Sequence, residues 1–234
     1  MFRTPEWGAL LALVTLVSMI RTGVARRRPS PRETSQILDS LELGAQLLGV
    51  LWGFDLALSD RLGRPGAHLL ASVCAAAWVM RSWAWEGLRW RRGPLSPWAA
   101  VILGLVLGWP LAMVGAFAQQ WLGPPLPMPE VFAQGPSWAW AVAVIFVTPM
   151  LEEIYFRGFV YRALALRWTA AEGVVGSAVL FALAHGSSAT FGSLTVIGLG
   201  LGLLRWGSRG LLVPMVAHGV NNAFAYFQIH FQMF

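Results

Sequence analysis

The sequence predicts an all-α protein, a polytopic membrane helix bundle of about eight transmembrane helices. The chain of 234 residues is 56% hydrophobic and only 12% charged, so a water-soluble domain of this composition would lack enough polar surface to cover itself. Apolar runs recur along the whole chain, and many of them have aromatic or charged flanks. Arginines gather in alternate connections between these runs. These three observations together indicate a membrane protein.

Eight apolar runs give the expected helices. Several are shorter than the roughly 20 residues that a straight spanning helix needs, so polar flanks must complete some of the spans. The length of the first run also suits the core of a signal peptide, but its basic residues mostly follow it and no convincing cleavage site is present, which favours a retained anchor. The runs lie near residues 7–20, 41–58, 67–80, 98–121, 138–151, 174–184, 191–204 and 211–229.

The arginines predict how the helices are oriented. Lysine is absent, and most of the arginines follow the first, third, fifth and seventh runs. The positive-inside rule then places both termini outside the cytoplasm. We therefore expect an integral protein of a prokaryotic cytoplasmic membrane, with the Arg-rich loops cytoplasmic and facing anionic headgroups rather than nucleic acid. The arginines assigned to the cytoplasmic loops are Arg21, Arg26, Arg27, Arg28, Arg32, Arg89, Arg91, Arg92, Arg157, Arg162, Arg167, Arg205 and Arg209.

The chain is expected to divide into three regions. Residues 1–96 hold three accessory N-terminal transmembrane helices, and residues 97–136 hold the fourth helix and a Pro-rich non-cytoplasmic loop. Residues 137–234 carry nearly all of the polar residues that stand within apolar runs, so we expect the functional core there. No repeat of fixed period is visible, which argues against the inverted-repeat transporter folds. Cys74 is the only cysteine, which excludes disulfide scaffolds and cysteine-rich zinc sites.

The seventh helix contains four glycines, Gly192, Gly198, Gly200 and Gly202. Small residues let helix backbones approach each other closely in lipid. This pattern predicts tight packing against neighbouring helices rather than a ligand site.

Two adjacent glutamates and an arginine stand inside an apolar segment, "PMLEEIYFRGF". A charge at the centre of a membrane helix costs about 2.5–3.5 kcal/mol, so such residues usually face a protein interior or a water cavity. Glu153 and Arg157 are four residues apart, which predicts a helical ion pair. Glu152 is rotated by about 100° and is left free for chemistry, while Pro149 predicts a kink that admits water. The alternative is that both glutamates mark the cytoplasmic end of a span.

Two further polar pairs have helical spacing. Phe181 and His185 are four residues apart in "FALAHG", which places an aromatic wall beside the imidazole. His218 and Asn222 are four apart in "VAHGVNNAF", a donor and acceptor pair suited to holding a water or an oxyanion. Either pair alone is also what packed or helix-bridging side chains give. Their joint occurrence with the glutamates favours a site.

These residues together resemble a known family. "EEIYFR" fits the motif EExxxR, "FALAH" fits FxxxH, and "HGVNN" fits a histidine followed four residues later by asparagine. The chain is similar over about residues 137–229 to the CPBP family of intramembrane proteases, the CAAX prenyl endopeptidase and bacteriocin-processing or Abi group. Residues 137–234 are accordingly expected to be the catalytic CPBP-like helical core.

The resemblance implies an intramembrane endopeptidase that hydrolyses a peptide bond in a membrane-associated peptide or protein. Glu152 would activate a water as general base, His185 would orient that water, and His218 with Asn222 would stabilise the oxyanion. Prenylated proteins are substrates of the eukaryotic branch, whereas the short loops and the all-arginine basic set favour a prokaryotic member without a prenylated substrate. The supporting residues implied by the motifs are Glu153, Arg157 and Phe181.

Metal dependence is left open by the sequence. No cofactor is favoured, because there is no HExxH pattern and a metal-free, glutamate-dependent mechanism needs none. Zinc remains an alternative, with Glu152, His185 and His218 as its ligands.

The depth of the site is a difficulty. If the sixth helix enters from the cytoplasm near Ala171, His185 lies about 21 Å along it at 1.5 Å per residue. Either that helix begins below the membrane surface, or the residues between Arg157 and Ala171 project into the cytoplasm.

Two functions of other classes compete with the protease. One is a catalytically silent binding or immunity protein that captures a peptide in the same cavity, against which the intact motifs argue. The other is a small proton-coupled transporter, because relays also use buried glutamate and histidine. Glu42 and Asp55 in the second helix are the residues that would favour transport.

Overall fold

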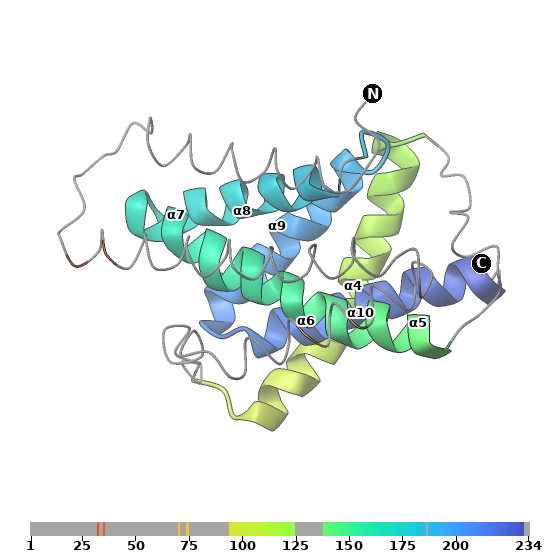
Figure 1. Ribbon diagram of the computed structural model, residues 1–234, viewed down its shortest axis with the longest axis horizontal. Coiled ribbons are helices and arrows are strands. Elements are labelled where there is room, and N and C mark those ends of the chain that lie inside the picture. The colour runs from red at the N-terminus through yellow and green to blue at the C-terminus, as the bar shows by residue number, and fades with distance from the viewer. Residues whose placement is uncertain are drawn as a thin grey trace.

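The structure is a computed structural model, and every regular element that it describes is a helix (Figure 1). The predicted all-α class is therefore confirmed for the described part of the chain. The count of eight spans is not confirmed, because the first three predicted helices lie outside that part except at isolated positions, and Glu42, Asp55 and residues 125–137 of the Pro-rich loop lie outside it as well. The described residues are 94–124, 138–185 and 187–231, with the single positions Arg32, Ser35, Leu70 and Cys74.

The helices pack around the C-terminal half of the chain. Helix α10 contacts α4, η1 and α6, while α9 contacts both α8 and α4. The largest buried apolar cluster surrounds η2 and includes Leu151, Ile154 and Phe181. The elements in chain order are α4 (Pro97–Leu122), α5 (Trp138–Val142), η1 (Ala143–Val147), α6 (Thr148–Glu153), η2 (Ile154–Val160), α7 (Tyr161–Arg167), α8 (Ala170–Ala184), α9 (Phe191–Ser208) and α10 (Leu212–Phe231).

Helix α4 matches the fourth predicted run closely. Ser96 caps its first turn by accepting a hydrogen bond from the Ala99 N–H at 3.2 Å, and Pro97 occupies a position where no donor is needed. The helix ends where Gly123 becomes extended. Among the described helices, α4 is the one long and apolar enough to cross a membrane, whereas α8 is apolar but shorter.

The fifth predicted run is part of a longer helix that contains two π-helical stretches. The elements α5, η1, α6, η2 and α7 follow one another without a break, so the helix continues to Arg167 rather than ending near residue 151. The assignment of Arg157, Arg162 and Arg167 to a connecting loop was therefore wrong, because all three lie in this helix. In the sequence their charges resemble those at the end of a membrane helix. In the structure Arg157 is fully buried, and its charge is balanced by Glu153.

Helix α8 positions the site residue His185, and α9 contains Arg205. Thr169 caps α8 by accepting from the Glu172 N–H, and His185 is the residue that ends this helix. His185 thus lies at the far end of α8 from Thr169, and the segment that precedes α8 is helical through Arg167. Arg205 lies in the last turn of α9 and not in a connection, which corrects a second loop assignment.

The predicted packing of the glycine-rich helix is confirmed. A Cβ at Gly198 would lie 3.0 Å from the Ala178 Cα and 3.2 Å from its carbonyl oxygen. Both are backbone atoms of α8, so they cannot move aside as a flexible side chain would. Helices α8 and α9 can therefore approach this closely only because residue 198 has no side chain.

We expect Gly198→Ala to lower the free energy of unfolding in detergent micelles by about 1–3 kcal/mol, the usual cost of overpacking. Gly207→Ala is the matched control, because nothing lies within 4 Å of a Cβ built at that position in the same helix. Equal stability of the two variants would show that α8 and α9 do not pack as described.

Candidate active site

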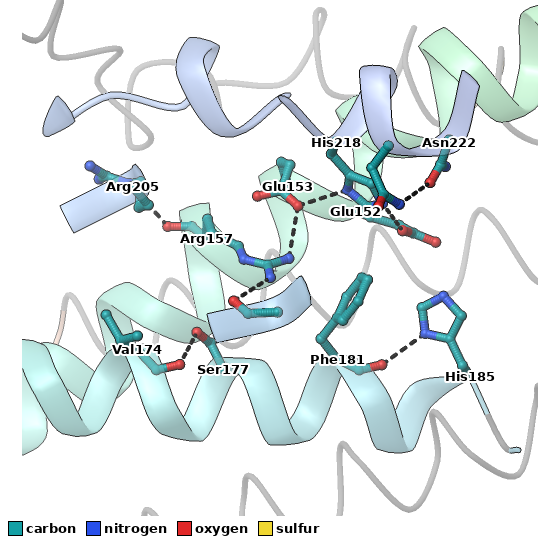
Figure 2. A network of polar contacts seen from close by, with 12 residues as sticks. Glu152, Glu153, Arg157, Val174, Ser177, Phe181, His185, Arg205, His218 and Asn222 are labelled. Atoms are coloured by element: carbon teal, nitrogen blue, oxygen red, sulfur yellow. Dashed lines mark hydrogen bonds and ion pairs between the residues drawn. The ribbon is translucent and has the colours of Figure 1, made fainter. Parts of the chain in front are cut away.

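A buried carboxylate is the centre of the polar network (Figure 2). Oε1 of Glu153 accepts a hydrogen bond from Nη1 of Arg157 at 2.8 Å and another from Nδ1 of His218 at 2.9 Å. Glu153 and Arg157 are fully buried, and His218 is nearly so. The predicted ion pair between Glu153 and Arg157 is present. The hydrogen bond from His218 was not predicted, because the two residues are 65 positions apart and lie on different helices.

Arg157 connects this carboxylate to α9. Its Nη2 donates to the Gly198 carbonyl at 3.0 Å, while its guanidinium carbon lies 4.8 Å from the centre of the Phe181 ring. A buried guanidinium needs such partners, because leaving it unpaired in an apolar interior costs several kcal/mol. The arginine therefore holds η2, α8 and α9 together.

Glu152 has a different environment from its neighbour. Its side chain is 26% exposed, and its Oε2 lies 3.6 Å from Nε2 of His218. This separation is longer than a hydrogen bond but short enough for both groups to contact one water molecule. Because Nδ1 of His218 donates to Glu153, Nε2 is the ring nitrogen that faces Glu152. Of the two glutamates, Glu152 is thus the one left accessible.

His185 lies at the exposed end of α8. Its Nδ1 is 2.8 Å from the Phe181 carbonyl oxygen. A carbonyl can only accept, so Nδ1 carries the proton and Nε2 of the neutral ring is free to accept a hydrogen bond. Figure 2 shows His185 and Glu152 toward the same end of the network, opposite to Arg205.

The Phe181 ring was predicted to lie beside one imidazole, that of His185. In the structure it also contacts His218 and Arg157. Its ring centre lies 4.7 Å from that of His185 and 5.6 Å from that of His218, with both pairs arranged edge to face. The same ring packs edge to face on Phe156 and lies under the Arg157 guanidinium. It therefore spaces the two histidines and screens the ion pair from solvent.

Asn222 is held by the backbone of the long helix. Its Nδ2 donates to the Val144 carbonyl at 3.0 Å, and its Oδ1 accepts from Asn221 at 3.2 Å. One of its two amide N–H bonds is thus committed to η1. The amide is fixed in orientation by these contacts, which sequence reasoning did not identify.

The described residues do not form a three-ligand metal site. No group of three His, Cys, Asp or Glu side chains with suitable geometry occurs among them. Glu152 and His218 are close, but His185 does not join them as a third ligand in this arrangement. The residues considered for zinc therefore do not fit a tetrahedral site as they are placed here.

Two glutamates, an arginine and two histidines thus converge in an apolar helical core, which makes this core the candidate functional site. The family model described as Rce1-like, type II CAAX prenyl endopeptidase, matches residues 134–224. This segment is less than half of the chain and contains all three motifs. The resemblance to the CPBP family is therefore confirmed, and at the family level it supports a CAAX-type intramembrane protease, an integral membrane protein with a peptide or protein substrate. No curated protein and no solved structure matches the chain.

Removing the buried cation should be more harmful than removing the whole ion pair. We expect Arg157→Met to lower the free energy of unfolding by about 3–5 kcal/mol, because Glu153 would keep its charge with only His218 beside it. Adding Glu153→Gln should recover part of that loss. Chemical unfolding of the wild type, both single variants and the double variant in micelles measures this coupling, and strictly additive losses would contradict it.

Proposed function

We propose that the protein is an intramembrane endopeptidase that hydrolyses a peptide bond in a membrane-associated peptide or protein. The observation that carries the proposal is the difference between two adjacent glutamates. Glu153 is fully buried and bound by Arg157 and His218, whereas Glu152 is partly exposed and faces Nε2 of His218. One carboxylate is thus structural, and the other is available to a water molecule.

In the proposed reaction Glu152 takes a proton from a water whose oxygen attacks the scissile carbonyl carbon. Nε2 of His185 accepts a hydrogen bond from that water and orients it, because Nδ1 of the same ring is bound to the Phe181 carbonyl. The C–N bond then breaks, and the leaving amine takes the proton from Glu152. The proton that Glu152 takes from the water thus ends on the leaving amine, and the remaining OH of the water becomes part of the new carboxyl group.

His218 and Asn222 are proposed to stabilise the oxyanion. The bond from Nδ1 of His218 to Glu153 fixes the orientation of the ring so that Nε2 faces Glu152, and in the proposed reaction the protonated ring donates from Nε2 to the oxyanion. The amide of Asn222 has one N–H on the Val144 carbonyl and a second N–H to offer. Both donors are fixed before substrate binds, which is the property that makes an oxyanion site effective.

The finer assignments extend the family-level conclusion. We propose that the protein is a prokaryotic member of the CPBP family in the cytoplasmic membrane, with its Arg-rich loops cytoplasmic. The all-arginine composition supports a prokaryotic origin, and the arginines that remain on alternate connections, at residues 21–32, 89–92 and 209, support the orientation. The substrate is then a membrane-bound peptide or protein without a prenyl group.

A comparison of protein termini in the native membrane tests the proposed function. We expect Glu152→Gln and His185→Ala to abolish the same set of cleaved termini, since loss of a general base typically lowers rates by about 10²–10⁴-fold. Glu172→Gln is the matched control, because Glu172 acts at the capped start of α8, where glutamine also serves. If all termini persist in both site variants while the proteins remain inserted and folded, the site binds or transports rather than cleaves.

Chelation tests the choice of a metal-free mechanism. Because Glu152 is proposed to activate water directly, we expect cleavage to continue in the presence of a zinc chelator such as 1,10-phenanthroline. The measurement is the rate at which a cleaved terminus forms in membranes with and without the chelator. Inhibition that zinc reverses and magnesium does not would overturn this mechanism.

A further inference from the structure

Each π-helical stretch leaves one backbone carbonyl without a partner along its own helix. In η1 the Thr148 N–H donates to the Ala143 carbonyl, five residues back, and in η2 the Tyr161 N–H donates to the Phe156 carbonyl. An α-helix spans four residues per hydrogen bond instead of five. The change of register at the end of each π stretch therefore skips the carbonyl of Val144 in the first case and that of Arg157 in the second. In the first case the next carbonyl, that of Ile145, also lacks its α-helical donor, because Pro149 has no N–H.

Both skipped carbonyls accept a hydrogen bond from a side chain on another helix. Val144 accepts from Asn222 on α10 at 3.0 Å, and Arg157 accepts from Nε of Arg205 on α9 at 3.3 Å, which is drawn at the left of Figure 2. An unpaired buried carbonyl is costly. Each donor therefore favours the π register over a regular α-helix at the point where it binds.

Arg157 is consequently bound to α9 through both its side chain and its backbone. Its side chain donates to the Gly198 carbonyl, and its backbone carbonyl accepts from Arg205. If η2 lost its extra residue and became α-helical, everything before it would rotate by about 100° and shift by about 1.5 Å relative to α7. Glu152 and Glu153, directly before η2, would then no longer face His218.

We propose that Arg205, which lies outside the three motifs, is a positioning residue that holds η2 in the π register and thereby aims Glu152 and Glu153. The catalytic consequence rests on the proposed function, whereas the effect on the register does not. Arg205 does not touch the reacting atoms in this proposal, because it acts through the Arg157 carbonyl.

Two substitutions of equal length separate this role from the other contacts of Arg205. Counted from Cα, the side-chain nitrogen of glutamine stands where Nε of arginine stands, so Arg205→Gln keeps the N–H donor. Arg205→Met has a similar length and no donor. Both remove the positive charge and the stacking of the guanidinium on Tyr161, whose ring centre lies 5.6 Å away. A difference between the two variants therefore reports on the hydrogen bond to Arg157.

Hydrogen exchange of the full-length protein in lipid nanodiscs gives a readout that is independent of activity. In Arg205→Met we expect the amides of residues 154–162 to exchange roughly three- to tenfold faster than in the wild type, as loss of one hydrogen bond predicts. In Arg205→Gln they should stay within about twofold. Equal exchange in the two variants, or faster exchange spread evenly over α8, α9 and α10, would overturn the role of Arg205.

Turnover of a synthetic peptide that spans a cleavage site found by the comparison of termini completes the test. Arg205→Met should lower kcat about tenfold with KM unchanged, and Arg205→Gln should restore it, because positioning affects the chemical step rather than binding. A changed KM with normal kcat would contradict positioning. If the wild type cleaves no peptide, the proposed function fails, and the exchange experiment still decides whether Arg205 holds the π register.

Discussion

The structure depends on one buried carboxylate, that of Glu153, and on the two cationic or polar groups that bind it. A carboxylate in a fully buried position is stable only when its partners balance the loss of hydration. Arg157 comes from the same helix and His218 from α10, and Arg157 is in turn bound to α9. Three helices are therefore held in a single relative arrangement, since moving any of them would leave a charge unpaired in an apolar interior.

This constraint explains why two adjacent glutamates do different work. Neighbouring residues on a helix point about 100° apart, so when Glu153 is turned into the core, Glu152 is turned to the partly exposed side. His218 contacts both, with one ring nitrogen on each carboxylate. The structural carboxylate thus orients the imidazole that faces the proposed base, and the accessible carboxylate needs no further support from its own helix.

Sequence patterns predicted the parts of the site that lie within one helix turn. The Glu153–Arg157 pair and the Phe181–His185 contact follow from a spacing of four residues, and both are present. The bond between His218 and Glu153 did not follow, because it depends on how separate helices pack. The π stretches were also missed, since one extra residue leaves no periodic signal. Because charged residues usually mark the end of an apolar helix, this helix was expected to end near residue 151, whereas the fold continues it and buries Glu153 and Arg157.

The position of Asn222, the last residue of the third motif, depends on how closely α10 approaches η1. Pro149 has no N–H, so it cannot donate to the Ile145 carbonyl, which an α-helical residue at that position would bind. That carbonyl would lie 2.8 Å from a Cβ at Gly219, so only a residue without a side chain lets α10 come this near. Asn222 is one turn beyond His218, and at this distance its amide reaches the Val144 carbonyl. The glycine that follows His218 is therefore a condition for the asparagine to be held in place.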